Sequence, residues 1–227
     1  QRETEANPHD TPERRAAHFD AMNATIAQLH SYEPDAIGLG DYGRATGFVE
    51  RQVARWSKQY QAAAAPRIPA MDRLIEWLPR HVPPGDETRL VHGDYRLDNV
   101  IFHPTEPRVL AVLDWELSTL GHPLSDFAYQ VMAWRLAAEE FRGLKGCDFA
   151  ALGIPTEEEY VAAYCRRTGR GAIAHWDVYL IFNMFRVAAI LHGVLARATH
   201  GNAASDDAVA TGSRARLVAD VAWAMAQ

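Results

Sequence analysis

The sequence predicts a mostly helical α+β fold in which a small β segment interrupts a series of helices. Three observations carry this prediction. Apolar residues recur at helical spacing on both sides of the chain's middle, short β-branched runs fill the stretch between, and proline and glycine mark the boundaries. With 227 residues, 48% of them hydrophobic, the chain can bury one core, or one core and a small extension.

The helix boundaries carry recognisable start and stop signals. A polar stretch over residues 1–10, expected to be frayed, precedes Thr11 and Pro12, which are typical of a helix start. Thr156 and Glu159 have the spacing of a capping box. Helices are expected over 11–29 and 48–61, over a stretch that opens near Pro69 and is ended by Pro79, Pro83, Pro84 and Gly85, and over 125–135, 156–169, 173–198 and 205–226.

The β segment lies between residues 90 and 113. Its apolar runs are Leu90-Val91, Val100 to Phe102 and Val109 to Leu113, and a proline-rich turn separates the last two. We expect short strands around a hairpin, with chemistry placed at their ends, because strand ends hold polar side chains more rigidly than long connections do.

Composition excludes several classes of function. The net charge of −6 and the pI of about 5.9 are not those of a basic nucleic-acid-binding surface. No apolar run approaches the roughly 18–20 residues of a membrane span, and the polar start lacks the apolar core of a signal peptide. Cys147 and Cys165 form neither a CxxC pair nor a disulfide framework. We therefore expect a cytoplasmic protein with no nucleic-acid or membrane partner; its oligomeric state is left open.

The segment after Val91 has the residues that phosphoryl transfer needs. It reads His92-Gly93-Asp94-Tyr95-Arg96-Leu97-Asp98-Asn99, and Asp114 follows Asn99 by fifteen residues at the end of the next apolar run. Such chemistry uses one carboxylate to orient an acceptor hydroxyl and take its proton, and oxygen ligands for Mg²⁺. Asp94 is the candidate base, and Asn99 and Asp114 are the candidate ligands. Asp94 and Asn99 taken alone are also common turn residues.

This pattern resembles the aminoglycoside phosphotransferases and related small-molecule kinases such as choline kinase. The resemblance covers residues 90–128 closely and includes Leu113-Asp114-Trp115-Glu116 and Gly121-His122-Pro123-Leu124-Ser125-Asp126-Phe127-Ala128; the flanking helices are similar in layout. It implies that residues 11–227 form a protein-kinase-like C-terminal lobe, with the catalytic and metal-binding loops on a small β hairpin. It also implies an ATP-dependent phosphotransferase that uses Mg²⁺ and acts on a hydroxyl group of a small molecule.

The resemblance assigns roles residue by residue. Asp94 is the catalytic base, and Asn99 and Asp114 bind Mg²⁺ and through it the nucleotide. His92 supports the loop from behind, and Asp126 binds the loop backbone and starts its own helix. Two further residues have supporting roles at the phosphate and the metal, namely Arg96 and Glu116.

The sequence departs from the family in its nucleotide-binding elements. Enzymes of this type carry a β-rich N-terminal lobe with a glycine-rich loop and a strand lysine. We expect that lobe to be absent here, because the lysines are Lys58 in a helical pattern and Lys145 in a loop. The lone chain should then be weakly active or inactive. The alternative is a non-catalytic, kinase-like binding module.

Two other motifs are weaker evidence of function than the pattern around Asp94. Gly38 to Gly43 matches the G-x-G-x-x-G pattern, but Pro34 and the absence of a preceding strand favour a loop between helices. His92 and Asp94 with a distant histidine, His175, His192 or His200, would imitate an iron site with two histidines and a carboxylate. Those oxygenases need a β-barrel, which the helical flanks disfavour.

The sequence only partly restricts which substrate would accept the phosphoryl group. Family members that bind polycations use clustered carboxylates on late helices, whereas here the only late acidic pair is Asp206-Asp207. The residues of the motif from His92 to Asn99 resemble those of kinase-like domains related to the domains fused to acyl-CoA dehydrogenases more than those of the antibiotic kinases. That resemblance favours a hydroxyacyl thioester or another apolar alcohol, although fold alone does not fix a substrate.

Overall fold

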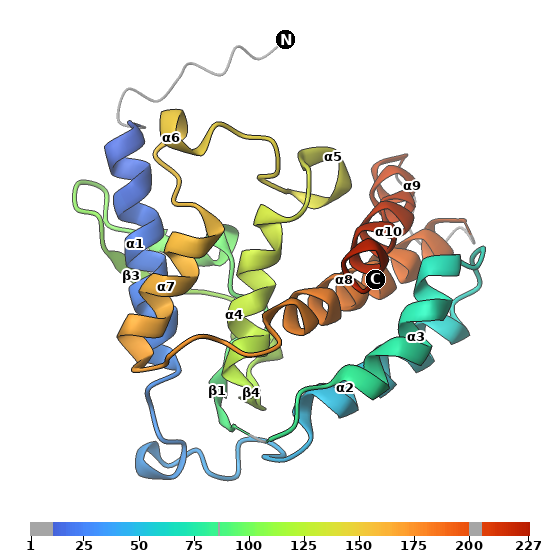
Figure 1. Cartoon of the computed structure of the whole chain (residues 1–227), viewed down its shortest axis with the longest axis horizontal. Coiled ribbons are helices and arrows are strands. Elements are labelled where there is room, and N and C mark those ends of the chain that lie inside the picture. The colour runs from blue at the N-terminus through green and yellow to red at the C-terminus, as the bar shows by residue number, and fades with distance from the viewer. Residues whose placement is uncertain (1–10, 86, 200–205) are drawn as a thin grey trace.

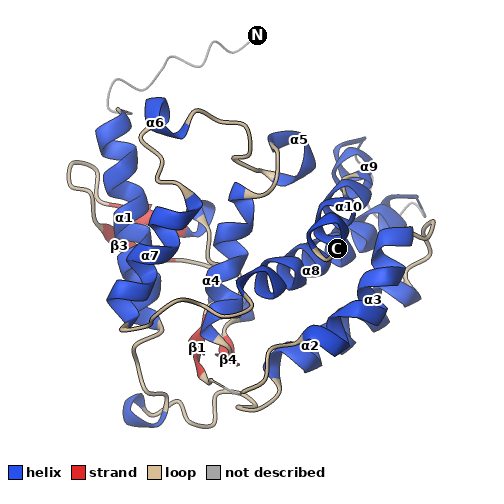
Figure 2. Ribbon diagram, in the orientation of Figure 1, coloured by secondary structure: helices blue, strands red, loops and turns tan. Residues whose placement is uncertain are grey.

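In the computed structural model, residues 11–85, 87–199 and 206–227 are described, so the expected frayed start over residues 1–10 lies outside the described residues. The α-helices are α1 Pro12–Leu29, α2 Phe48–Ala62, α3 Pro69–His81, α4 Pro123–Val131, α5 Ala138–Phe141, α6 Phe149–Leu152, α7 Glu157–Thr168, α8 Trp176–Thr199, α9 Asp206–Ser213 and α10 Ala215–Met225. The strands are β1 Arg89–Val91, β2 Val100–Phe102, β3 Val109–Val112 and β4 Thr119–Gly121. The predicted α+β, mostly helical fold is confirmed (Figure 2).

Local signals set several helix boundaries as predicted. The Thr11 hydroxyl accepts a hydrogen bond from the backbone N–H of Arg14, with Pro12 at the first helical position of α1. Thr156 and Glu159 form the predicted capping box of α7, which ends at Gly169 in the left-handed conformation. Each cap satisfies backbone groups that a helix end leaves without partners.

The helices form two groups that meet along α4 and α8 (Figure 1). In one group, α1 packs against α7. In the other, α8 packs against α2, α9 and α10, and α3 packs against α10. The β segment lies at the foot of α4 and behind α1 in this view. Both helical groups thus support the loops that join the strands.

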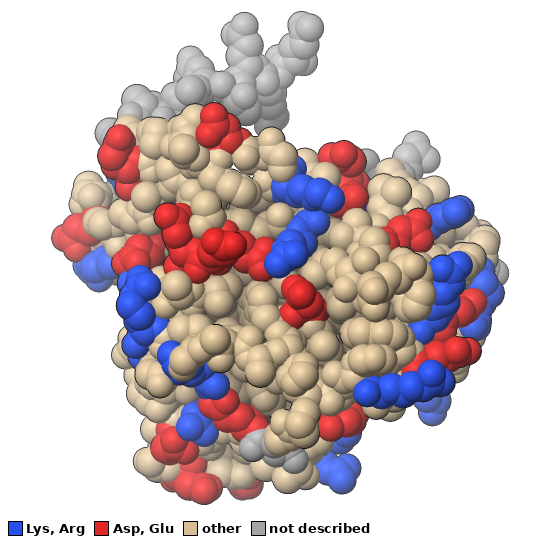
Figure 3. Space-filling model, in the orientation of Figure 1, with Lys and Arg blue, Asp and Glu red and all other residues tan. Residues whose placement is uncertain are grey.

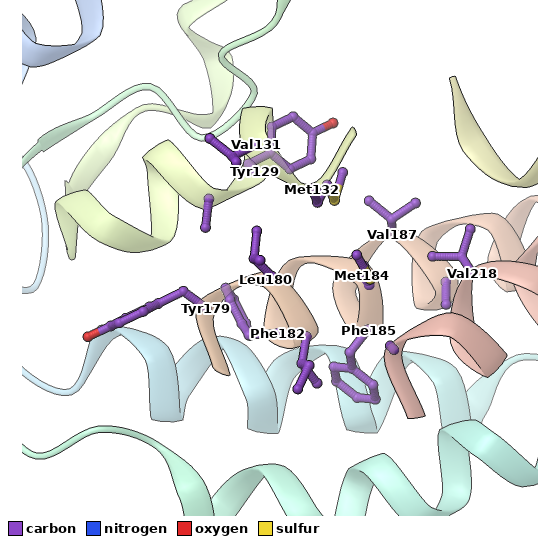
Figure 4. Packing of buried hydrophobic residues seen from close by; sticks show 14 of the residues in the cluster. Tyr129, Val131, Met132, Tyr179, Leu180, Phe182, Met184, Phe185, Val187 and Val218 are labelled. Carbon is purple, nitrogen blue, oxygen red and sulfur yellow. The ribbon is translucent and has the colours of Figure 1, made fainter. Parts of the chain in front are cut away.

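Helix α8 is the centre of the hydrophobic core. Leu180 points towards Tyr129 and Val131 of α4 and Met132 in the turn that follows α4, and Phe185 points to the opposite side (Figure 4). The expectation that no apolar run approaches the length of a membrane span is wrong: among the described residues, α8 is long and apolar enough by length and composition, although 78% of its most apolar window is buried inside the protein. Its hydropathy is therefore that of a core helix.

Two small antiparallel sheets carry the loops of interest. β2 pairs with β3, with Ile101 opposite Ala111 and an irregularity before Phe102, which is the predicted hairpin. β1 pairs with β4, with Leu90 opposite Leu120. Strand β4 was not predicted: its three residues, Thr119-Leu120-Gly121, include one large apolar side chain, whereas the predicted strands were read from runs of apolar or β-branched residues.

Several other expectations require correction. α3 ends at His81, within the expected stretch from Pro79 to Gly85, but Pro79 itself lies inside the helix, because a proline near the end of a helix removes one hydrogen bond without unwinding the last turn. The single helix expected over 205–226 is two helices, α9 and α10, and Ser205 lies outside the described residues. The short helices α5 and α6 lie in a stretch for which no structure was predicted.

The motif from Gly38 to Gly43 lies, as predicted, in a loop between α1 and α2. Asp35–Ile37 form one 3₁₀ turn, and Gly38 ends it with a positive φ of 73°. No strand precedes the motif within the described residues, so it lacks the strand–turn–helix context of a dinucleotide site.

The surface carries mixed charge. On the face shown in Figure 3, acidic and basic side chains are interspersed over a largely uncharged surface. This face has no extended positive field of the kind that nucleic-acid-binding proteins use.

Candidate active site

The loop that joins β1 to β2 depends on one glycine. Gly93 has a φ of 83°, and a Cβ atom at this position would lie 2.7 Å from the backbone oxygen of Leu117. Both the left-handed backbone and the close approach exclude a side chain. The chain therefore turns sharply after His92 and presents Asp94 just beyond the turn.

Asp94 is held by its own loop. The Asn99 side-chain amide donates from Nδ2 to Asp94 Oδ2 and to the Asp94 backbone oxygen, both at 2.9 Å. Arg96 Nε lies 3.3 Å from the same Oδ2. The Asp94 side chain keeps 17% of its surface exposed, so its carboxylate is fixed in direction yet reachable from solvent.

Asn99 and Asp114 are brought together by the hairpin. The backbone N–H of Leu113 donates to the Asn99 backbone oxygen at 2.8 Å, which places the next residue, Asp114, beside Asn99. Asp114 is exposed and has a φ of 64°, a left-handed conformation that costs energy for a residue other than glycine. The structure thus brings the predicted base and both predicted ligands to one place.

The donor set fits a hard divalent cation. The Asn99 side-chain nitrogen donates to Asp94, so the Asn99 Oδ1 lies on the opposite side of the amide group. This oxygen makes no hydrogen bond to any described residue. Asp114 adds an exposed carboxylate. The described residues contain no group of three or more His, Cys, Asp or Glu side chains that could hold a metal ion. One carboxylate and one amide suit Mg²⁺, which takes few protein ligands and completes its shell with water and phosphate.

His92 supports the loop and is not available to a metal. Its Nδ1 accepts a hydrogen bond from the Asp94 backbone N–H at 3.2 Å, so Nε2 carries the proton and donates to the Leu113 oxygen at 2.8 Å. Its ring also packs edge-on against Trp115, with centroids 4.8 Å apart. Both nitrogens are used, which argues against the iron site considered from the sequence; His200 lies outside the described residues.

Asp126 connects α4 by hydrogen bonds to the loop that joins β1 to β2. Its carboxylate accepts from the backbone N–H groups of His92 at 2.7 Å and Gly93 at 2.8 Å, and His30 Nε2 lies 3.2 Å away. Burial raises the pKa of Asp126, but the hydrogen bond and charge of His30 and the two backbone donors outweigh it, so the pKa lies below its ordinary value. The expectation that Asp126 starts its helix is wrong: His122 is the N-cap and accepts from the Leu124 N–H, and Asp126 faces inward.

The two remaining predicted residues differ in their surroundings. Arg96 joins a row of alternating charges, since its Nη1 lies 3.2 Å from Asp98 Oδ2 and Asp98 also pairs with Arg142. Glu116 is exposed, in the 3₁₀ turn after Asp114, and pairs with no described residue. Arg96 therefore contacts the candidate base Asp94 as well as Asp98, whereas Glu116 contacts none of the other candidate residues.

A cavity of about 430 Å³ is bordered by Arg96 and Asp98 of the loop that follows Asp94 and by Tyr129 of α4, with mostly apolar side chains around the rest of its wall. We call it the apolar cavity. Arg142 and Leu144 also border it. Its aromatic and thioether walls come from α1, from α4 with the turn that follows it, and from α5: Phe19, Met22, Tyr129, Met132, Trp134 and Phe141.

Three residues of the site were not found from the sequence: His30 at the end of α1, Tyr129 on α4 and Arg186 on α8. Burial raises the pKa of the Tyr129 phenol, and the neighbouring Asp94 carboxylate raises it further. Arg186 Nη2 donates to the Gly93 oxygen at 2.7 Å. The sequence offers a signal for one of these three residues: Arg186 lies in the middle of a largely apolar helix.

The comparisons with known proteins agree with this geometry. The model of the phosphotransferase enzyme family (APH) matches residues 1–181, and the chain belongs to this family. A crystal structure of a Ralstonia eutropha protein, proposed to be an aminoglycoside phosphotransferase, superposes with a TM-score of 0.93 at 52% identity, over 96% of this chain and 67% of that chain. Choline kinase LicA of Streptococcus pneumoniae shares the fold at 16% identity, with a TM-score of 0.52 over 92% of this chain and 66% of its own.

Curated relatives are much longer than this chain. Acyl-CoA dehydrogenase family member 10 of Mus musculus is 48% identical over 214 residues, which are 93% of this chain but 20% of the mouse protein. Acyl-CoA dehydrogenase family member 11 of Homo sapiens is 45% identical over 88% of this chain and 26% of its own length. The chain therefore corresponds to a kinase-like part of these relatives, which are named for another activity.

Proposed function

We propose that the protein is an ATP-dependent, Mg²⁺-assisted phosphotransferase that acts on a hydroxyl group of a small molecule. The observation that carries this proposal is the grouping of Asp94, Asn99 and Asp114 at one end of the β2–β3 hairpin, with the first carboxylate oriented by the second residue. Phosphoryl transfer depends mainly on position and charge, which such a rigid arrangement supplies.

In this proposal Asp94 orients the acceptor hydroxyl and takes its proton as the phosphoryl group moves. The Asn99 amide holds the carboxylate in one rotamer, and Arg96 balances part of its charge. Asn99 Oδ1 and the Asp114 carboxylate would hold the cation. Mg²⁺ at this position would supply positive charge to the phosphate oxygens of ATP.

The acceptor would occupy the apolar cavity. Its walls are mostly aromatic and aliphatic, and the charged residues at its edge, Arg96, Asp98 and Arg142, include two cations and one anion. A polycationic sugar would find few carboxylates there, whereas an alcohol with an apolar body would bury its surface. The names of the curated relatives concern acyl-CoA, which is compatible with a hydroxyacyl thioester as acceptor.

A second candidate is a kinase-like module that binds ligands without turnover. It is favoured by the position of the two lysines, since Lys58 lies in α2 and Lys145 in the loop after α5, and neither is on a strand. Turnover of ATP by the full-length protein would eliminate this candidate.

Calorimetric titration with ATP, with and without Mg²⁺, tests the proposal. We expect magnesium-dependent binding to the full-length protein, and its loss in Asp114→Asn. The matched control is Asp220→Asn, which removes an exposed carboxylate from α10. The same titration of the 227-residue chain measures what this part contributes alone. Absence of binding at millimolar ATP in both proteins would contradict the proposal.

A further inference from the structure

Arg186 is a charged residue in the most apolar helix of the protein. Its neighbours Phe185 and Val187 on α8 are 0% and 2% exposed. Moving a guanidinium into such surroundings costs free energy unless the charge is compensated. Burial accordingly lowers the pKa of Arg186, and the charges of Tyr129, Asp126 and Asp94 act in the opposite direction.

The contacts of Arg186 converge on the catalytic loop. Its Nη2 donates a hydrogen bond of 2.7 Å to the Gly93 backbone oxygen. The guanidinium carbon lies 5.1 Å from the ring centroid of Tyr129 on α4 and 5.8 Å from that of Trp56 on α2, both within cation–π range. No described carboxylate lies within ion-pair distance of Arg186, so its compensation comes from a backbone carbonyl, two aromatic faces and the more distant Asp94 and Asp126.

The Gly93 oxygen belongs to the peptide group that directly precedes the Asp94 side chain. The N–H of this peptide donates to His92 Nδ1, and its C=O accepts from Arg186. The preceding peptide is fixed by Asp126 through the Gly93 N–H. A peptide plane held at both edges fixes the position of Asp94 Cα and the direction of its N–Cα bond, which leaves only φ and the side-chain torsions to set the direction of the carboxylate.

We propose that Arg186 is a positioning residue of the phosphoryl-transfer site, acting through the Gly93–Asp94 peptide to aim the Asp94 carboxylate. This inference rests on the proposed function, because it assigns the aimed carboxylate a catalytic task. Trp56 and Tyr129 hold the guanidinium plane in place, and they connect α2 and α4 to the loop. A half-buried residue of the central helix α8 thereby sets the direction of a residue at the surface of the site.

The test compares Arg186→Met with Arg197→Met in the full-length protein. Methionine keeps most of the apolar stem of arginine but removes the donor and the charge, and Arg197 is an exposed arginine of the same helix. We expect Arg186→Met to lower kcat for ATP turnover by roughly 100-fold, the effect of displacing a catalytic group by about 1 Å. The KM and the Kd for ATP should change by less than about threefold, because the nucleotide is bound through Asn99 and Asp114. Arg186→Lys, which keeps one donor and the charge, should recover part of kcat.

A second readout does not depend on turnover. Amide hydrogen exchange at Gly93 and Asp94 should become faster in Arg186→Met than in wild type and Arg197→Met, while exchange in the rest of α8 stays slow. If the wild type does not turn over ATP, the proposed function fails, and the exchange data still decide whether Arg186 holds the loop. Unchanged kcat and unchanged exchange in Arg186→Met would overturn the inference. So would a loss of kcat, ATP affinity and α8 protection together, since that result would show a purely structural role.

Discussion

The Asp126 carboxylate accepts a 2.7 Å hydrogen bond from the backbone N–H of His92, 34 residues earlier in the chain. With the second bond to Gly93 and the contact with His30, this places a buried anion directly behind the loop that joins β1 to β2. His30 also lies 2.7 Å from the Tyr164 hydroxyl, so α1, α4 and α7 meet at this point. The loop between β1 and β2 is therefore supported by α1, which precedes it in the sequence, and by α4 and α7, which follow it.

Acid stability should depend on Asp126. Its pKa in the folded protein is below the ordinary value of about 3.9. Between the two pKa values the unfolded chain binds more protons than the folded protein does. The contribution of Asp126 to the free energy of unfolding is therefore complete above about pH 4 and is lost as the pH falls below that value. Asp126→Asn should lose roughly 1.5–3 kcal/mol at pH 7 and show a shallower decline in acid. Urea denaturation from pH 7 to pH 3 measures both effects, with Asp220→Asn as control; parallel acid limbs in wild type and Asp126→Asn would contradict this account.

Gly93→Ala should damage the loop more than the positive φ alone explains. The added Cβ would lie 2.7 Å from the Leu117 backbone oxygen, whereas at Gly38, whose φ of 73° is similar, a Cβ would meet nothing within 4 Å. Gly38→Ala should cost about 1–2 kcal/mol, the penalty of the left-handed conformation. Gly93→Ala should cost about 1–3 kcal/mol more and should lower ATP turnover by displacing Asp94.

Chemical denaturation and turnover assays on the two variants separate the conformational penalty from the steric one. Equal losses of stability in Gly93→Ala and Gly38→Ala would show that Leu117 yields without cost. Normal turnover in Gly93→Ala would show that the loop tolerates a different path.

The catalytic segment was predictable because its contacts are local. Asp94 and Asn99 share one loop, and a single hairpin carries Asp114 back to them, so order and spacing in the sequence nearly determine their proximity. The caps of α1 and α7 were predictable for the same reason, since Thr11 and Thr156 bind backbone groups three residues away.

The missed features depend on contacts between distant segments. β4 exists because Leu120 pairs with Leu90, and one large apolar side chain among its three residues does not show this alone. Arg186 reaches Gly93 across 93 residues, and nothing in the local pattern of α8 indicates that partner. His30 was likewise assigned no role, because its partner Asp126 lies on another helix.

The apolar cavity should determine which alcohols are accepted. Ala133 borders the cavity, so Ala133→Phe fills part of it while leaving the cation ligands untouched. Transfer from ATP to organic alcohols should fall by roughly tenfold or more, with ATP binding and transfer to water unchanged. Ala162→Phe is the matched control, because Ala162 borders a separate groove along α7. A panel of hydroxyacyl thioesters, sugars and simple alcohols provides the assay, and equal transfer by both variants to every alcohol would place the acceptor elsewhere.

Asp94→Asn in the full-length protein separates catalysis from binding. The amide keeps the size of the side chain and can still accept from Asn99 Nδ2, so the loop should retain its shape. It cannot take a proton, and loss of a general base typically lowers the rate by roughly 10²–10⁴-fold. We expect turnover to fall by that factor while the Kd for ATP and Mg²⁺, measured by calorimetry, changes little. Asp220→Asn should behave as wild type. Unchanged turnover in Asp94→Asn would remove Asp94 from the reaction, and wild-type binding of ATP with no turnover in any variant would instead favour a module that binds nucleotide without transferring phosphate.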